Sequence, residues 1–186
     1  MAQILFNLID DDAKFEPVAS GAERFDDVNA SYWYFQAISY LSWANILSGY
    51  PDGTFRPDIP MTRAELTTVM SRFFEFASGN NPFPDIAGHW AYRYINSAFN
   101  KGWIYGYPDG TFRPDSSITR AETVTIVNRV LNRQPNPATI DYHVTFYLFS
   151  DLSRHHWAYY QIMEAAIEHE FVYDEDGDEI WICLRY

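Results

Sequence analysis

One decapeptide occurs twice in this chain and constrains its fold more than any other feature. The sequence Gly-Tyr-Pro-Asp-Gly-Thr-Phe-Arg-Pro-Asp fills residues 49–58 and again residues 106–115, at an offset of 57. The same offset relates Trp33 to Trp90, and it relates two copies of the tetrapeptide Thr-Arg-Ala-Glu. Such repetition in register is typical of a repeat protein, in which neighbouring units pack together because one unit alone cannot bury its apolar face.

A weaker third copy begins at residue 149. There, Phe-Ser-Asp-Leu followed by Trp157 has the spacing of Phe-Asp-Asp-Val at residues 25–28 followed by Trp33. The Asp-Gly dipeptide at residues 176–177 falls where the repeated loop also has Asp-Gly, and the given sequence stops where a third Thr-Arg-Ala-Glu would begin. We therefore expect a degenerate third unit that lacks its second helix.

Each full unit is predicted to be a helix, a tight loop and a second helix. From Trp90 to Phe99, apolar residues recur at three- and four-residue spacing, which predicts an amphipathic helix that ends at Gly102. In the loop, proline presets one backbone angle and glycine accepts the left-handed region, so we expect a rigid turn. The Thr-Arg-Ala-Glu segments at residues 62–65 and 119–122 are capping boxes that open the second helix.

Three segments lie outside the helical repeat pattern. Residues 140–148 alternate between apolar and polar, which predicts a strand inserted before the third unit, and residues 3–9 and 179–186 are further strand candidates. The predicted organisation is an N-terminal segment packed on the repeats, repeat 1, repeat 2, an inserted strand and the degenerate repeat 3. These parts occupy residues 1–24, 25–80, 81–137, 138–148 and 149–186, respectively.

Composition and charge exclude several classes of protein. The 186 residues are 47% apolar, which is enough to bury a core and excludes a disordered chain. With 13 basic and 25 acidic residues, the net charge of −12 excludes a general attraction for nucleic acid. No apolar run approaches the roughly 18 residues that a membrane helix needs, and the apolar start has no basic flank of the kind a secretory signal carries.

The order of these motifs closely resembles the S-layer homology repeat of bacterial cell-surface proteins. The resemblance covers residues 25–134 as two full copies and residues 149–181 as a degenerate third. It implies a mainly α fold, with a pseudo-threefold arrangement of helix-loop-helix repeats and a few short β-strands. It also implies non-covalent anchoring to a cell-wall polysaccharide or peptidoglycan-linked glycan, often through pyruvylated amino sugars held in grooves between repeats. A protein of this kind is exported, so we expect its signal peptide to lie outside the given sequence.

Arg63 and Arg120 are the candidate ligand-binding cations. Each falls in the first turn of a predicted helix, where free backbone N–H groups and the helix dipole favour an anion. A guanidinium there can hold a carboxylate, such as a pyruvyl group, through two parallel hydrogen bonds. The residues alone favour a simpler pairing with a neighbouring Asp or Glu, whereas the family resemblance favours the ligand role.

The other candidate ligand-binding residues belong to three sets: Trp33, Trp90 and Trp157; Asp27, Asp85 and Asp151; Thr62, Glu65, Thr119 and Glu122. For the tryptophans, a core position and stacking on a sugar are weighed evenly. The aspartates are expected mainly to cap helices, with groove lining as the minority view. The threonines and glutamates are expected mainly to close the capping boxes, with hydrogen bonds to sugar hydroxyls as a secondary role.

No catalytic residue, metal site or cofactor is expected. The adjacent His155 and His156 point in different directions on a helix, and residues 174–179 lack the ligand pattern of a calcium loop and are expected to form a turn between a helix and a strand. Hydrolase and phosphate-loop motifs are absent from the sequence, so an enzyme is the weakest hypothesis. The alternative to glycan binding is an assembly domain that associates with a second copy or another domain through its incomplete third repeat.

Overall fold

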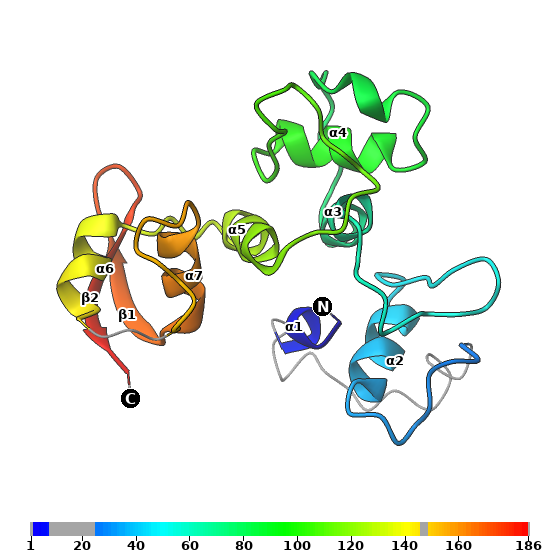
Figure 1. The fold of residues 1–186 in the computed structure, drawn as a ribbon, viewed down its shortest axis with the longest axis horizontal. Helices are drawn as coiled ribbons and strands as arrows, with labels where there is room; N and C mark the ends of the chain where they lie inside the picture. The colour runs from blue at the N-terminus through cyan, green and yellow to red at the C-terminus, as the bar shows by residue number, and fades with distance from the viewer. Residues whose placement is uncertain (1, 8–24, 146–148, 186) are drawn as a thin grey trace. The chain divides into compact units, whose positions relative to one another are not determined.

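The computed structural model describes residues 2–7, 25–145 and 149–185 (Figure 1). The described chain is mainly helical with one small sheet, which confirms the predicted fold class. Its helices are α1 (Ala2–Asn7), α2 (Phe35–Trp43), α3 (Arg63–Ser71), α4 (Tyr92–Asn100), α5 (Arg120–Val130), α6 (Pro137–His143) and α7 (Tyr159–Ala166). A 3₁₀ turn, η2 (Pro84–Ile86), and strands β1 (His169–Tyr173) and β2 (Glu179–Leu184) complete the set. The pseudo-threefold arrangement of the repeats stays a prediction.

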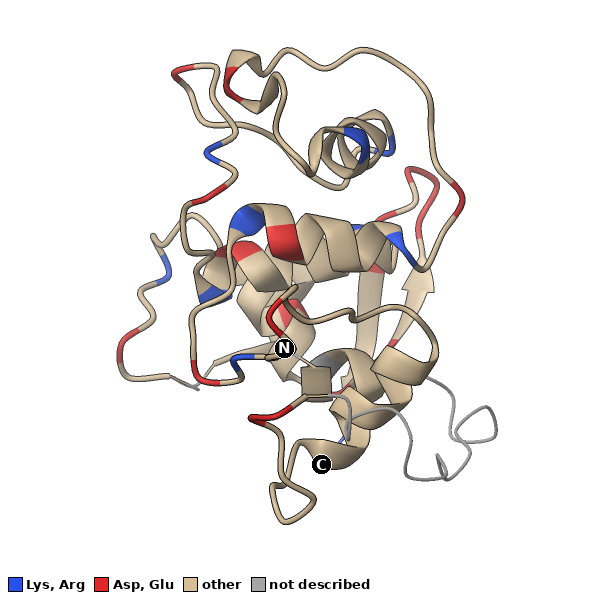
Figure 2. Cartoon of the chain, turned by 90° about the vertical axis from the view of Figure 1, so that its right-hand side faces the viewer, with Lys and Arg blue, Asp and Glu red and all other residues tan. Residues whose placement is uncertain are grey.

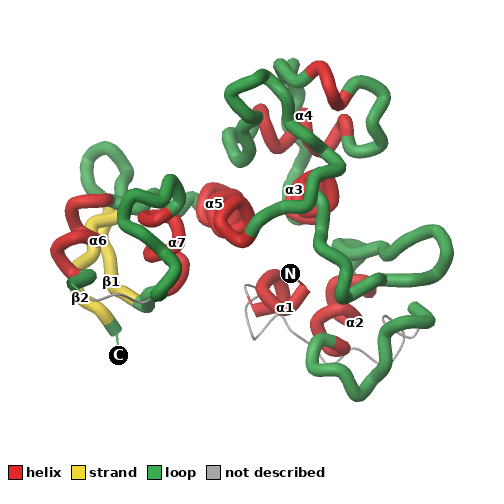
Figure 3. The backbone as a smooth tube through the Cα atoms, in the orientation of Figure 1, coloured by secondary structure: helices red, strands yellow, loops and turns green. Residues whose placement is uncertain are grey.

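Long loops join these elements, as Figure 3 shows. Acidic residues are found on loops and helices along the chain and outnumber the basic ones (Figure 2). The chain divides into two compact units, which do not coincide with the three repeat units. The N-terminal compact unit is made of Met1–Pro60 with Arg72–Glu75, and the C-terminal compact unit is made of Met61–Ser71 with Phe76–Tyr186.

The N-terminal compact unit is built around α2. Helix α1 packs against it, and the rings of Phe6 and Tyr40 meet edge to face at 5.5 Å between centroids. The strand predicted for residues 3–9 is wrong, because Ala2–Asn7 form a helix; residues 8 and 9 lie outside the described part of the chain. The core of the unit also holds Phe25 and Ile38, against which the loop residue Phe55 packs.

The C-terminal compact unit contains the second helix of the first repeat together with the second and third repeats; in it, α3 packs against α4 and α5 packs against α7. The segment that leads into α3 pairs with the segment that leads into α5. The Ile118 amide donates to the Met61 carbonyl at 2.9 Å, and the Arg63 amide donates to the Ser116 carbonyl at 3.0 Å. This pairing fixes the start of α3 against the loop of the second repeat.

The strand predicted for residues 140–148 is also wrong, because residues up to His143 belong to helix α6. Asn136 caps this helix by accepting hydrogen bonds from the amides of Ala138 and Thr139, and proline occupies its first turn. Ile140 and Val144 are four residues apart and fully buried, so the apolar spacing fits a helix as well as a strand. Residues 146–148 lie outside the described part of the chain.

The chain ends in an antiparallel hairpin of β1 and β2, which confirms the strand predicted at residues 179–186 as far as Leu184. The turn at Asp174–Asp178 joins these two strands, so its expected place between a helix and a strand is wrong. The hairpin packs against α6, and Trp181 completes a core with Ile140, Val144, Tyr159 and Met163. In the third repeat, this hairpin stands where the repeated loop stands in the other two.

Candidate functional site

The aspartates that precede the first helix of each full repeat hold the repeated loop. Asp27 accepts hydrogen bonds from the amides of Phe55 and Arg56 at 2.7 and 2.6 Å. Asp85 does the same for Phe112 and Arg113, with the Arg113 amide at 2.7 Å. Because each arginine has a positive φ, of 59° and 57°, two successive amides converge on one carboxylate.

The expectation that Asp27 and Asp85 cap helices is therefore wrong. The residue at the N-cap of α2 is Tyr34, and the one at the N-cap of α4 is Ala91. Both aspartates instead reach about 28 residues along the chain, a distance that local spacing does not reveal. Asp151, their counterpart in the third unit, is exposed, and the hairpin leaves no equivalent loop for it to hold.

A second set of contacts stiffens each loop from within. The Arg56 guanidinium binds the Asp52 carboxylate at 2.6 Å and lies 4.1 Å from the centre of the Tyr50 ring. Arg113 repeats this with Asp109 at 2.7 Å and stacks on Tyr107. Hydrogen bonds from Thr54 and Arg56 lower the pKa of the Asp52 carboxyl to about 2, so the acid stays ionised at neutral pH.

The N-terminal compact unit has a groove of about 470 Å³ beside the loop that contains Arg56. Its lining combines aromatic, charged and apolar side chains: Asp27, Tyr32, Trp33, Tyr34, Arg56, Pro57, Asp58 and Ile59. Only Asp27 and Trp33 were among the predicted site residues. The segment from Arg56 to Asp58 could have been found because it lies within the repeated decapeptide, whereas Tyr32, Tyr34 and Ile59 carry no repeat signal.

The three tryptophans at the repeated position are exposed, so the core alternative is wrong for all of them. Trp33, Trp90 and Trp157 expose 76%, 59% and 63% of their surface. Each lies two residues before the first residue of its helix, in a turn, and not on the buried face of the helix. An exposed indole offers both an apolar ring and an N–H donor to a ligand.

The Arg63 side chain is buried and bonded to neighbouring groups of the protein. Its Nη1 donates to Glu122 Oε1 at 2.9 Å, and its Nε donates to the Phe112 carbonyl at 2.8 Å. Its Nη2 reaches the Tyr105 carbonyl at 3.3 Å, and the guanidinium lies over the rings of Tyr107 and Phe112. The simpler alternative, pairing with a neighbouring carboxylate, describes this arginine.

Arg120 holds the same place in the second tetrapeptide but is exposed at the start of α5. The described residues supply no hydrogen bond or ion pair to its side chain. Arg63 is received by the loop of the following repeat, whereas the unit that follows Arg120 has a hairpin in place of that loop. Of the two predicted cations, Arg120 is the one whose guanidinium can meet a ligand.

Both predicted capping boxes are confirmed. The Thr62 amide donates to Glu65 and the Glu65 amide donates to the Thr62 hydroxyl, at 2.7 and 3.1 Å. Thr119 and Glu122 make the same reciprocal pair at the start of α5. Glu122 also accepts from the Tyr107 hydroxyl at 2.7 Å, so it joins the cap, the loop and Arg63.

His155 and His156 lie in the exposed turn before α7, as expected for a solvated start of a helix. The Ala158 amide donates to His156 Nδ1 at 3.2 Å, and the Ala91 amide donates to His89 Nδ1 in the second repeat at 3.1 Å. The third unit thus keeps the turn of a full repeat although it lacks the loop.

Comparison with known proteins identifies the repeats. The S-layer homology domain matches residues 24–67 and 82–124, which cover most of the two full units. The chain therefore belongs to the S-layer homology family and contains two matched repeats. The match does not extend into the third unit, whose origin as a degenerate repeat stays a prediction.

Several known proteins are similar to this chain over part of their own length. It is 43% identical over 166 residues to the cellulosome-anchoring protein of Acetivibrio thermocellus, an alignment covering 85% of this chain and 36% of that protein. It is 35% identical over 174 residues to cell surface glycoprotein 1 of the same organism, covering 87% of this chain and 7% of the relative. An endoglucanase of Bacillus sp. strain KSM-635 is 31% identical over 123 residues, covering 65% of this chain and 13% of that protein.

The chain thus spans about a third or less of the length of these relatives. Within the residues that the structure describes, the helices are too short or too polar to cross a lipid bilayer.

Proposed function

We propose that this chain is a non-covalent anchoring module of the bacterial cell surface, which binds cell-wall polysaccharide. The names of two relatives, a cellulosome-anchoring protein and a cell surface glycoprotein, support a surface role. Two matched S-layer homology repeats support it as well. The protein that carries this module is exported, and the module itself works at the cell wall.

The observation that carries the proposal is the exposure of Trp33 and Trp90 at the same position of two matched repeats. Exposing a large apolar ring to water costs free energy that burial would recover, at about 25 cal/mol per Å² of apolar surface. Repeated exposure at one position indicates a surface that meets a ligand. Sugar rings have apolar faces and polar rims, and an indole can contact both.

The groove beside Trp33 is large enough for a sugar ligand. Its volume of about 470 Å³ lies within the range of about 300–1,000 Å³ typical of small-molecule sites. Asp58 and Tyr32 add polar groups beside the indole, which suits the hydroxyls of a glycan. Because Asp27 and Arg56 in this groove already hold the loop, we assign them to its shape first and to ligand contact second.

For the acidic part of the glycan, we propose a pyruvylated amino sugar whose carboxylate is held by Arg120. The exposed guanidinium has two parallel N–H donors suited to a carboxylate, and it stands at the positive end of α5. Arg63 is not proposed as a ligand residue, because Glu122 and two carbonyl groups take its donors.

Co-sedimentation with purified bacterial cell walls tests both parts of the proposal. We expect the Trp33→Ala, Trp90→Ala double variant to lose most of its wall binding while it keeps the thermal unfolding of the wild type. Trp43→Ala is the matched control, because Trp43 is also exposed but lies at the end of α2, outside the groove. Equal binding by wild type and the double variant would contradict the role of the indoles.

Mild acid treatment of the walls, which removes pyruvyl groups, tests the finer proposal. We expect Arg120→Ala to weaken binding to native walls at least tenfold and to make no further difference on treated walls. If treated and native walls bind wild type equally, the glycan is not recognised through pyruvate, and the anchoring proposal then rests on the tryptophans alone.

A specific observation favours the assembly alternative. The hairpin of the third unit exposes four apolar side chains: Phe171, Val172, Tyr173 and Ile182. Under this alternative, a second copy or another domain covers them. Light scattering after gel filtration decides between the two: a dimer at micromolar concentration that Val172→Lys converts to monomer would support assembly, and a monomer throughout would contradict it.

We infer no catalytic role for the chain. The endoglucanase among the relatives shares only a small part of its length with this chain. Hydrolysis of wall polymer by the purified protein would contradict this inference.

A further inference from the structure

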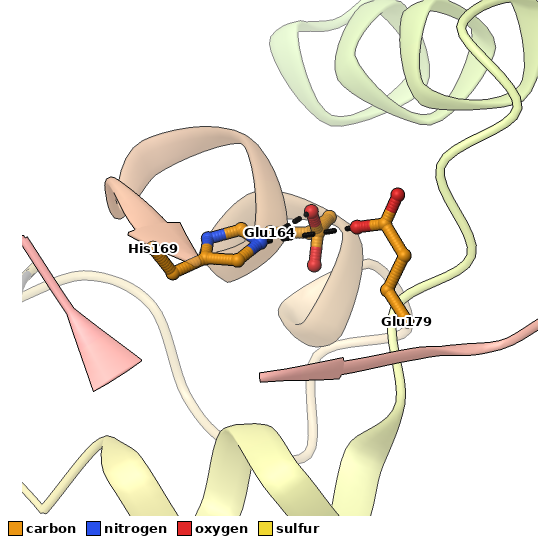
Figure 4. A group of neighbouring side chains, drawn as sticks. All are labelled: Glu164, His169 and Glu179. Carbon is orange, nitrogen blue, oxygen red and sulfur yellow. Dashed lines mark ion pairs between the residues drawn. The ribbon is translucent and has the colours of Figure 1, made fainter. Parts of the chain in front are cut away.

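Three ionisable side chains from three different elements of the third repeat meet inside the C-terminal compact unit (Figure 4). Glu164 comes from α7, His169 is the first residue of β1 and Glu179 is the first residue of β2. His169 Nε2 lies 3.2 Å from Glu164 Oε1 and 3.8 Å from Glu179 Oε2. Water has almost no access to the cluster, because the exposed fractions of the three side chains are 0%, 5% and 1%, in chain order.

Most of the carboxylate oxygens in this cluster have no hydrogen bond. Glu164 Oε1 and both oxygens of Glu179 are buried without a donor among the described residues. Leaving a buried polar atom without a partner costs about 1–3 kcal/mol, and more for a charged group. A cation beside these oxygens would therefore stabilise the cluster.

The histidine ring presents its basic nitrogen to the carboxylates. His169 Nδ1 lies 2.7 Å from the Ile167 carbonyl oxygen. Since a carbonyl can only accept a hydrogen bond, Nδ1 carries the proton and Nε2 of the neutral ring carries the lone pair. That lone pair faces the two carboxylates, so all three groups offer electron pairs to the same point.

Neighbouring groups hold the donor atoms in place. The Trp181 indole N–H donates to Glu164 Oε2 at 2.9 Å and leaves the other oxygen of Glu164 to face His169. The Trp181 ring also stacks on the His169 ring, with 3.9 Å between centroids. Hydrogen bonds of this kind, from outside a set of ligands, orient the ligands of metal sites.

Two carboxylates this close repel each other when both are ionised. One carboxylate oxygen of each acid and a ring nitrogen of His169 all lie within 4.8 Å of one another. A divalent cation between the two acids would replace this repulsion by attraction.

We propose that Glu164, His169 and Glu179 form a structural zinc site that ties the C-terminal hairpin to α7. Imidazole and carboxylate together suit Zn²⁺, whereas Ca²⁺ and Mg²⁺ prefer oxygen ligands alone. Tetrahedral bonds of about 2.1 Å place two ligand atoms about 3.4 Å apart. The distances of 3.2 and 3.8 Å bracket this value.

The second Glu179 oxygen or one water completes the four ligands of the proposed site. Burial makes the site a structural one, because a catalytic zinc needs an open position. The hairpin takes the place of the repeated loop in the third repeat, and a cation that joins α7, β1 and β2 supplies a cross-link there.

Titration of the chelator-treated full chain with ZnCl₂ tests the proposal, in a Cys183→Ser background that removes the exposed thiol. We expect one Zn²⁺ per chain by calorimetry. At a hundredfold excess of Zn²⁺ over Kd, the melting temperature should rise by about 5–10 °C. CaCl₂ and MgCl₂ should produce no rise at the same concentrations.

Glu179→Gln should abolish the zinc-dependent rise and leave the metal-free protein at least as stable as wild type, because the amide removes the repulsion with Glu164. Glu170→Gln is the matched control: its side chain is exposed on β1, next to His169, and pairs with Arg185. It should keep the full response to zinc.

Absence of zinc binding by the folded wild type would overturn the proposal, and so would equal binding by wild type and Glu179→Gln. Imidazole NMR gives a second measurement that does not depend on a variant. Zinc should shift the Nε2 resonance of one histidine at one equivalent, and an unchanged spectrum would contradict the site.

Discussion

Arg63 and Arg120 have the same sequence neighbours, Thr before and Ala-Glu after, yet different surroundings. Arg63 is buried among two carbonyls, one carboxylate and two aromatic rings, whereas Arg120 is exposed. Local sequence therefore placed both side chains at a helix start, but the loop that receives Arg63 comes from residues more than 40 positions away.

This difference predicts a large effect on stability for one arginine and a small effect for the other. Arg63→Ala should lower the free energy of unfolding by about 3 kcal/mol, because it removes the positive partner of Glu122 in a largely buried place. Arg120→Ala should change it by less than about 0.5 kcal/mol, as is usual for an exposed residue. Urea denaturation of the two variants checks this, and equal destabilisation by both would contradict the assignment of roles.

The Glu122 carboxyl should make stability sensitive to acid. Burial raises its pKa, but hydrogen bonds from Thr119 and Tyr107 and the charge of Arg63 outweigh burial and hold the pKa below the ordinary value of 4.5. A lowered pKa stabilises the folded state above the unfolded pKa, so this contribution is complete above pH 4.5 and is lost as the pH falls through the folded pKa.

Chemical denaturation at pH values from neutral to below 4.5 measures this contribution. We expect wild type to lose stability below pH 4.5 more steeply than Glu122→Gln, which has no carboxyl to protonate at this position. Parallel pH profiles for the two proteins would show that another carboxyl is responsible.

At the scale of elements, the repeated loop is held more by packing than by its turn residues. A Cβ on Gly106 would overlap the Phe83 ring and lie 2.7 Å from the Thr111 carbonyl oxygen. Gly110 in the same loop has a positive φ of 82° but open space around it. Substitutions at the two glycines therefore measure steric overlap and backbone strain separately.

Gly106→Ala should therefore destabilise the protein more than Gly110→Ala. We expect about 2–3 kcal/mol for the overlap at Gly106 and about 1 kcal/mol for the left-handed backbone at Gly110. Thermal unfolding of both variants checks the order, and the reverse order would show that strain, not packing, dominates the loop.

Helix and strand predictions succeeded where two signals agreed. The capping boxes at Thr62 and Thr119 combine a cap with an apolar pattern, and both open helices. The segment after Asn136 alternates like a strand but begins with Asn-Pro, a good helix start, and it forms α6. A short apolar alternation is compatible with either element, so the flanking residues decide.

At the scale of the whole molecule, the charge of −12 should oppose contact with an acidic polymer at long range. Raising the ionic strength from about 10 mM to about 150 mM shortens the screening length from roughly 30 to 8 Å and weakens this repulsion. We therefore expect faster association with native, acidic walls as salt is added over this range, and little change with walls whose pyruvyl groups have been removed.

Stopped-flow or surface-based kinetics on both wall preparations measures the effect. Association that slows with salt on native walls would mean that local attraction by arginine, not the overall charge, governs the encounter.

The sequence was sufficient to predict the repeat units, the capping boxes, the mainly helical class and the family, because these depend on residue order and spacing within one unit. It placed Trp33, Trp90, Asp27 and Asp85 at repeated positions, but it did not reveal that the tryptophans are exposed or that the aspartates hold distant loops. Long-range packing buries Arg63 but not Arg120, and it brings Glu164, His169 and Glu179 together. Burial and long-range contacts depend on what other parts of the chain place around a residue, and local sequence does not encode those neighbours.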